Sequence, residues 1–241
     1  LKRVPGVKKV SVTTNGTLLP RYGRELADAG LDSVNVSLDT TDPELERGIT
    51  GSSGVVDSVL EGIELMRSLG VPVKLNAVLL SETAGTITDL ARFAAHGVPV
   101  RFIELMPMGV GKNETGLNPD KALELLRAVW PDLHPVDARI GSGPAHYYAS
   151  GRLAAPIGMI DAVSHRFCAS CNRVRVTSRG WLKPCLCFDE GADLRELLRG
   201  GASDAQLLET IRLTIYNKPR QHCFDTPKEM TECRLMSQIG G

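Results

Sequence analysis

The sequence lacks an excess of charge of either sign, because 28 Lys and Arg residues balance 28 Asp and Glu residues. It therefore creates no overall field that would attract nucleic acid or an anionic membrane surface, and any anion must bind at a local site. It also lacks an apolar run near the roughly 20 residues that a membrane helix needs, and it does not open with a signal segment. These absences argue against nucleic-acid and membrane partners and favour a cytoplasmic location.

Apolar residues make up 42% of the 241 residues, which is ample for a buried core. Disulfides are not expected in a reducing compartment, so the six cysteines are interpreted as metal ligands or inert thiols. They are Cys168, Cys171, Cys185, Cys187, Cys223 and Cys233.

The first half of the chain alternates between strand and helix patterns. Strands are predicted over 8–16, 31–39, 71–80 and 98–107. Helices are predicted over 20–30, 55–69, 86–97 and 119–130. Four βα units in series predict an α/β fold with a parallel sheet and right-handed crossovers. From about residue 131 short strands and Gly and Pro turns dominate, with a last helical stretch at 194–217, so domains are expected over 1–130 and 131–241.

Polar residues stand at the ends of the predicted strands, among them Thr13, Ser37, Asn76 and Glu104. Ligands of parallel α/β folds gather at the carboxyl ends of the strands, so these residues together predict a site. Lys74 differs, because it lies inside an otherwise apolar strand. Its side chain must either extend to solvent or meet an anion, and we favour the anion.

Residues 174–184, VRVTSRGWLKP, predict a β-hairpin that turns at Gly180. The expected cross-strand pairs are Thr177 with Trp181, Arg175 with Lys183, and Arg173 with Cys185. Cys185 would thereby return beside Cys168 and Cys171, on the face that carries the two arginines. Val174 and Val176 are expected on the opposite face, in the core.

A CxxC pair followed by one cysteine 14 residues later is a strong signal for a metal site. If Cys187 supplies a fourth ligand, the site is a closed structural zinc centre. If it does not, the three cysteines leave a zinc, or one iron of a four-iron cluster, with an open position. An open metal beside two arginines suits a phosphate-bearing substrate, because guanidinium groups pair with phosphate oxygens.

The stretch FCASCNRVRVTSRGWLKPCL, with TTNG, VNVSLD, RFIELMPMG, KPRQH and the terminal IGG, resembles the GTP 3′,8-cyclase family of molybdenum cofactor biosynthesis. This is a family of radical S-adenosylmethionine (radical SAM) lyases, and the likeness runs in order across nearly all of the chain. It implies a partial (βα)6-type TIM-like barrel with its first units missing. A C-terminal α+β segment would carry the metal-binding hairpin.

The resemblance also implies roles for individual residues. The C-terminal cysteines would bind a [4Fe-4S] cluster whose open iron contacts the purine of GTP: Cys168, Cys171 and Cys185. GTP contacts would come from Thr13, Lys74, Arg173, Val174 and Arg175. Ser37 and Met106 would contact S-adenosylmethionine, and the terminal Gly240 and Gly241 would enter the active site and be needed for catalysis.

One departure from the family is serious. The CxxxCxxC loop that binds the radical-generating [4Fe-4S] cluster does not occur in these 241 residues, which begin at Leu1. We therefore expect a fragment whose N-terminal portion, with the second cluster, belongs only to the full-length parent, and we expect this chain to be inactive alone. The parent would convert GTP to (8S)-3′,8-cyclo-7,8-dihydroguanosine 5′-triphosphate. Expected partners are GTP, the next enzyme of the pathway (cyclic pyranopterin monophosphate synthase) and a second copy in a homodimer.

Two other interpretations remain open at the level of the sequence. The chain could belong to another radical SAM enzyme with an auxiliary cluster, although the Arg-x-Arg pair would then have no evident purpose. It could also be a zinc-stapled binding module in which Cys187 completes the site.

Overall fold

The computed structural model describes residues 1–141 and 143–239, and the chain divides into two compact units. Unit 1 comprises Leu1–Leu105 and Thr115–Asp161, and unit 2 comprises Met106–Glu114 and Ala162–Gly241. Each unit is described by itself. The predicted domain boundary at residues 130–131 stays a prediction, since compactness does not test which parts fold independently.

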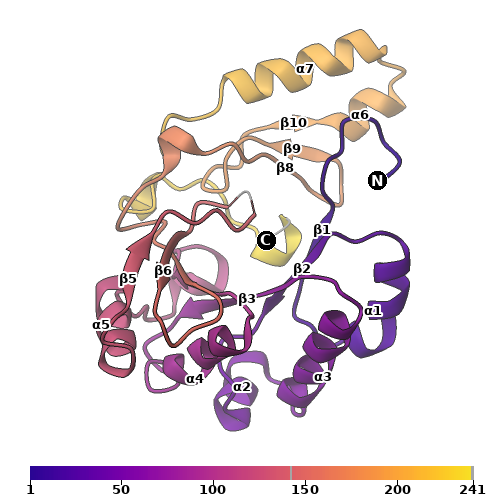
Figure 1. Cartoon of the computed structure of the whole chain (residues 1–241). Coiled ribbons are helices and arrows are strands. Elements are labelled where there is room, and N and C mark those ends of the chain that lie inside the picture. Colours follow the sequence, from indigo (N-terminus) through magenta and orange to yellow (C-terminus); the bar gives the residue numbers. More distant parts are fainter. Residues whose placement is uncertain (142, 240–241) are drawn as a thin grey trace. The chain divides into compact units, whose positions relative to one another are not determined.

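Unit 1 is built on a seven-stranded sheet in the order β1-β2-β3-β4-β7-β6-β5 (Figure 1). Its strands are β1 (Ser11–Thr14), β2 (Ser33–Ser37), β3 (Val73–Leu79), β4 (Val100–Glu104), β5 (His134–Val136), β6 (His146–Ala149) and β7 (Ile157–Ile160). The first five strands in this order are parallel, and β6 and β5 continue the sheet antiparallel. The four predicted parallel strands are confirmed. The β-rich segment after residue 131 extends the same sheet.

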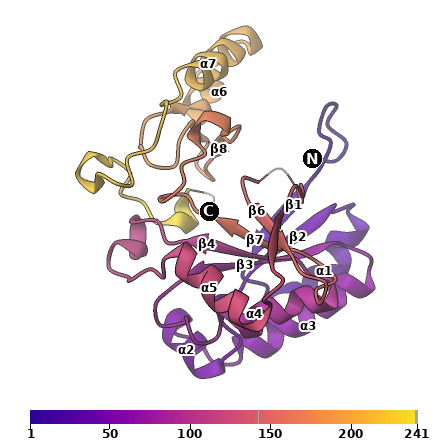
Figure 2. The same ribbon diagram turned by 60° about the vertical axis from the view of Figure 1, so that its left-hand side comes forward.

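Helices follow the parallel strands along one side of the sheet (Figure 2). They are α1 (Leu19–Asp28), α2 (Pro43–Thr50), α3 (Val55–Ser68), α4 (Ile87–Ala91) with the 3-10 turn η1 (Arg92–His96), and α5 (Pro119–Val129). All were predicted except α2. Its signal was present, because Pro43 begins the helix and the Asp42 carboxylate caps the amides of Glu44 and Leu45.

Alternation along the strands separates two faces of the sheet. Val34, Leu75, Val100 and Phe102 belong to one buried apolar cluster with residues of the helices. The intervening residues are largely polar and lie on the other face. The sheet therefore buries its apolar core on one face and carries mostly polar side chains on the other.

Unit 2 contains a small antiparallel sheet in the order β10-β9-β8. Its elements are β8 (Arg175–Val176), β9 (Trp181–Lys183), β10 (Ala192–Asp193), α6 (Leu194–Arg199), α7 (Asp204–Tyr216) and the 3-10 turns η2 (Gly109–Lys112), η3 (Cys168–Ser170), η4 (Pro227–Glu229) and η5 (Met236–Gln238). Within the described residues, no helix combines the length and apolar character needed to cross a membrane.

The expectation that Val174 and Val176 face a core is wrong. Their side chains are 41% and 57% exposed. The reason is that β8 forms the edge of a three-stranded sheet, while loop segments build the apolar cluster of unit 2 instead. That cluster consists of Met108, Cys187, Cys223, Phe224, Met230 and Ile239.

Two helical glycines predict opposite effects of the same substitution. A Cβ at Gly62 in α3 would lie 2.6 Å from Leu19 Cβ, whereas one at Gly48 in α2 would have no neighbour within 4 Å. Gly48→Ala should raise the free energy of unfolding by about 0.5 to 1 kcal/mol through helix propensity. Gly62→Ala should lower it by about 1 kcal/mol, because the clash outweighs that gain. Urea unfolding of both variants measures this, and effects of equal sign would contradict it.

Candidate functional site

The polar face of the unit 1 sheet gathers residues from four neighbouring strands. Thr13, Asn35 and Lys74 are neighbours across β1, β2 and β3. One step further along, Asn76 of β3 neighbours Arg101 of β4. Because residues two apart on a strand share a face, all five lie on the same side of the sheet.

Arg101 connects these strands through hydrogen bonds. Its Nε donates to Asn76 Oδ1 at 2.8 Å, and its Nη2 donates to Asn35 Oδ1 at 2.9 Å. Asn35 Nδ2 in turn donates to Thr13 Oγ1 at 3.2 Å. The sequence reasoning missed Arg101, although it shows the same signal as Lys74: a cation inside an apolar strand.

Both cations of this face are buried, with Lys74 9% and Arg101 8% exposed. Lys74 does not extend to solvent, and its Nζ donates to Ser33 Oγ at 3.4 Å. Burial lowers the pKa of each group, and the positive charge of Arg101 lowers the pKa of Lys74 further. Among the described residues, no carboxylate offsets either shift. Unbalanced buried charge is costly, and a bound anion would offset that cost.

Gly158 makes room for Arg101 on this face. In the sheet it lies between Arg101 on β4 and Tyr147 on β6. A Cβ at Gly158 would lie 3.0 Å from Arg101 Cγ and 2.9 Å from Tyr147 Cε1. The β5–β6 loop also reaches the cations, since a Cβ at Gly141 would lie 3.6 Å from Lys74 Nζ.

The predicted hairpin is present in unit 2. Arg175 pairs with Lys183, and the Thr177 amide donates to the Trp181 carbonyl at 3.0 Å. Gly180 forms the turn with a φ of 81°. The predicted pair of Arg173 with Cys185 lies beyond the last ladder pair and stays a prediction.

Two donors from residues 218–222 contact the CxxC cysteines. Lys218 Nζ donates to Cys171 Sγ at 3.3 Å and to the carbonyls of Cys171 and Arg173. The His222 amide donates to Cys168 Sγ at 3.4 Å. These contacts fix the turn that carries both thiols.

The pKa shifts of Cys185, Cys171 and Arg175 reflect burial and the charges of neighbouring groups. Burial raises the pKa of Cys185, and charge on Cys168 and Cys171 raises it further. Burial also opposes ionisation of Cys171, but hydrogen bonds from Arg173 and Lys218 outweigh it and lower that pKa. Burial lowers the pKa of Arg175, while Cys171 and Cys185 act in the opposite direction.

Cys187 has a different partner. Its Sγ lies 2.6 Å from Cys223 Sγ, and the Cys223 amide donates to it at 3.2 Å. Both thiols are buried, and burial together with Cys223 raises the pKa of Cys187 to about 12. A thiol held protonated is a poor metal ligand. Sequence spacing could not reveal this pair, because its members are 36 residues apart.

Four predicted residues remain, and one of them, Ser37, is the cross-strand neighbour of Asn76 on the polar face of unit 1. Ser37 is exposed at the end of β2 in unit 1, and Met106 packs against the apolar cluster of unit 2. Gly240 and Gly241 lie outside the described residues. In the chain that is described, no group of three or more His, Cys, Asp or Glu side chains is arranged to hold a single metal ion.

Known proteins resemble the chain throughout its length. Residues 1–94 match the radical SAM superfamily, and residues 98–224 match the family described as Molybdenum Cofactor Synthesis C. The whole chain is 37% identical to the GTP 3′,8-cyclase of Clostridium perfringens and 40% identical to that of Heliobacterium modesticaldum, and it covers 75% of each. It is 41% identical over 98% of its length to the Paracoccus denitrificans GTP 3′,8-cyclase and covers 70% of that protein.

Solved structures of Streptococcus suis SuiB share the fold. One has a TM-score of 0.56 at 14% identity and covers 94% of this chain and 60% of SuiB. A second, bound to S-adenosylmethionine, has the same TM-score and identity and covers 84% of this chain and 50% of SuiB. At this identity the likeness supports the partial-barrel fold alone.

The unbalanced charge of Lys74 predicts that its removal stabilises the protein. Lys74→Met should raise the free energy of unfolding by about 1 kcal/mol near neutral pH. The pKa of Lys74 in the folded protein is lowered from 10.5. Between this lowered pKa and 10.5 the unfolded chain binds more protons than the folded protein, so the stability of the wild type should rise with pH up to about 10.5. The advantage of the variant should therefore shrink at high pH.

Urea unfolding at several pH values up to about 10 measures this difference. The exposed Lys121, which pairs with Glu124, gives the control Lys121→Met, which should be near neutral. If Lys74→Met lowered the free energy of unfolding, the positive charge of Lys74 would already be offset within the protein.

Proposed function

Because the chain belongs to the GTP 3′,8-cyclase family of radical SAM enzymes, we propose that it binds and orients GTP at a cysteine-ligated cluster. The observation that carries this proposal is the pair of N–H donors in unit 2, Lys218 Nζ and the His222 amide, that contact the sulfurs of Cys171 and Cys168. The CxxxCxxC spacing is absent from these 241 residues. Binding GTP, and not generating a radical, is therefore the role proposed for the chain by itself.

The donor set fits an iron–sulfur cluster held by Cys168, Cys171 and Cys185. All three are free thiols of intermediate exposure, and N–H groups donate to two of their sulfurs. Hydrogen bonds of this kind stabilise thiolate ligands. When bound, a four-iron cluster with three cysteine ligands offers one iron to a substrate atom. Cys187 is left out of this set, because its partner is Cys223.

Each unit has its own group of cations that we propose for contacts with GTP. In unit 2 these are Arg173 and Arg175, with the backbone of Val174 between them, because guanidinium groups match phosphate oxygens in pairs. In unit 1 we assign Lys74 and Thr13 to GTP as well. Arg101 belongs with them, since it is buried beside Lys74 and shares a hydrogen-bond chain with Thr13.

The other predicted roles complete the proposal. Ser37 and Met106 would contact S-adenosylmethionine, and Gly240 and Gly241 would act in catalysis. The protein would work in the cytoplasm, as a homodimer that passes its product to cyclic pyranopterin monophosphate synthase. The reaction would be that of the family, conversion of GTP to 3′,8-cyclo-7,8-dihydroguanosine triphosphate, with this chain supplying orientation and electrostatics.

The cluster ligands are tested by reconstituting the chain anaerobically with iron and sulfide. Cys185→Ala should lose the visible iron–sulfur absorption, because it removes a ligand. Cys187→Ala should retain the absorption, and the exposed Cys233 provides the control Cys233→Ala. Loss of iron from Cys187→Ala together with bound zinc in the wild type would favour the zinc-stapled module instead.

The anion site is tested by titrating GTP into the reconstituted chain in a calorimeter. Arg173→Ala and Arg175→Ala should each weaken GTP binding about tenfold or more, as expected for a lost hydrogen bond between charged groups, without loss of iron. Arg179→Ala, in the exposed turn of the same hairpin, is the matched control. Unchanged affinity in both variants would argue against the assignment.

A further inference from the structure

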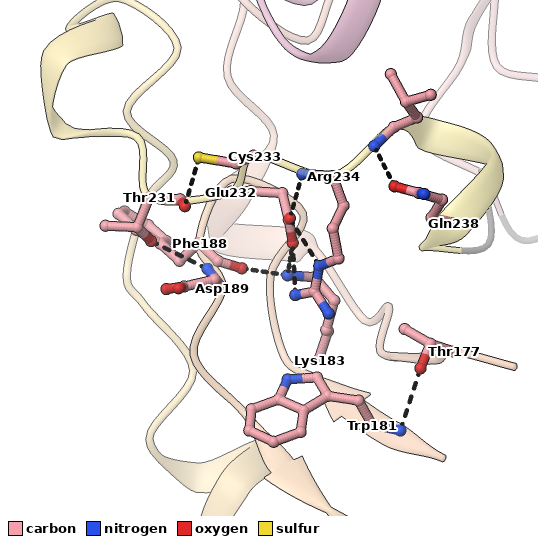
Figure 3. A network of polar contacts seen from close by, with 11 residues as sticks. Thr177, Trp181, Lys183, Phe188, Asp189, Thr231, Glu232, Cys233, Arg234 and Gln238 are labelled. Atoms are coloured by element: carbon pink, nitrogen blue, oxygen red, sulfur yellow. Dashed lines mark hydrogen bonds and ion pairs between the residues drawn. The ribbon is translucent and has the colours of Figure 1, made fainter. Parts of the chain in front are cut away.

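A buried ion network ties the C-terminal segment of unit 2 to the hairpin (Figure 3). Lys183 of β9 donates to the Glu232 carboxylate and to the Phe188 carbonyl. Arg234 completes the network, with its Nε and Nη2 each 2.9 Å from a Glu232 oxygen. The side chains of Lys183 and Glu232 are 0% and 1% exposed.

Backbone groups join the same two segments on either side of this network. The Glu232 amide donates to the Cys187 carbonyl at 3.3 Å. The Asp189 amide donates to Thr231 Oγ1 at 3.0 Å. The loop that follows Cys185 is therefore bonded to the segment around Glu232 at two of its residues, Cys187 and Asp189.

Apolar packing anchors the end of the segment as well. Ile239, the last residue described, is fully buried in the apolar cluster that also contains Cys187. Cys185 packs against this cluster. The chain before the terminal glycines is thus held at Glu232 and at Ile239. Glu232 bonds to Cys187 in the loop that follows Cys185, and Ile239 belongs to the apolar cluster against which Cys185 packs.

The Glu232 carboxylate stays charged over the ordinary pH range. Burial raises the pKa of Glu232, but hydrogen bonds from Arg234 and Lys183 outweigh it and lower the pKa to about 2. Buried ion pairs seldom stabilise a fold more than apolar residues of the same size would. What they supply is a defined partner and geometry, because a misplaced segment would leave a buried charge unpaired.

We propose that Lys183 and Glu232 are positioning residues that hold the C-terminal segment in register with the loop following Cys185. The described chain, which ends at Ile239, is thereby held against the loop that follows Cys185. The inference rests on the proposed function for the roles of Cys185 and the two glycines, but the register itself is a property of the chain without iron or nucleotide.

Hydrogen exchange of the metal-free chain tests the register. Glu232→Gln should raise amide exchange at least tenfold in residues 231–239 and 185–189, because Lys183 loses its partner. Exchange in α3 of unit 1 should not change. The control is Glu209→Gln, which breaks an exposed pair with Arg212 on α7 and should leave both segments protected.

A second comparison separates positioning from stability. The double variant Lys183→Met with Glu232→Gln has no unpaired buried charge and should recover the urea midpoint of the wild type. If positioning depends on the ion pair, its C-terminal segment should still exchange at least tenfold faster than in the wild type. Wild-type protection of residues 231–239 in this variant would overturn the proposal.

Arg234→Met decides the outcome if substitutions at the buried pair prevent folding. The Arg234 side chain is 37% exposed, so its loss should leave unit 2 folded. Faster exchange confined to residues 231–239 would support the proposal, and unchanged exchange would overturn it. Because no step uses iron or GTP, failure of the proposed function would appear in the reconstitution and titration experiments and not here.

Discussion

Positive charge buried without matching negative charge is the constraint on which the polar face of the sheet depends. Lys74 and Arg101 lie side by side on this face, and within the described chain no carboxylate offsets the pKa shift of either. Such an arrangement lowers the stability of the protein by itself. It persists because the opposite face of the same strands buries a large apolar cluster that offsets the cost.

Unit 2 uses buried charge for a different purpose. Lys183 is buried even more deeply than Lys74, but it pairs with Glu232 and with a backbone carbonyl. The paired cation bonds one segment of the chain to another, whereas Lys74 donates only to the Ser33 hydroxyl among the described contacts. Comparing the two lysines shows that burial alone does not identify a binding site, and that the partner of the charge decides its role.

Local sequence patterns were sufficient to predict the elements whose structure depends on residues close together in the chain. The β-branched runs and glycine stops placed the parallel strands and their helices, and alternation about Gly180 gave the pairs of Arg175 with Lys183 and Thr177 with Trp181. The same alternation separated two faces of the hairpin but could not say which was covered. Val174 and Val176 are exposed. Alternation could not predict this, because it does not specify which face of a hairpin other segments cover.

The sequence by itself determined the parallel α/β order, the family likeness, and the hairpin that turns at Gly180. These follow from periodicity, turn residues and short spacings, which act over a few residues. Only the tertiary structure decided that Cys187 meets Cys223, that Arg101 meets Asn35, and that Glu232 meets Lys183. Those contacts join residues far apart in the chain, and only the packed fold brings them together.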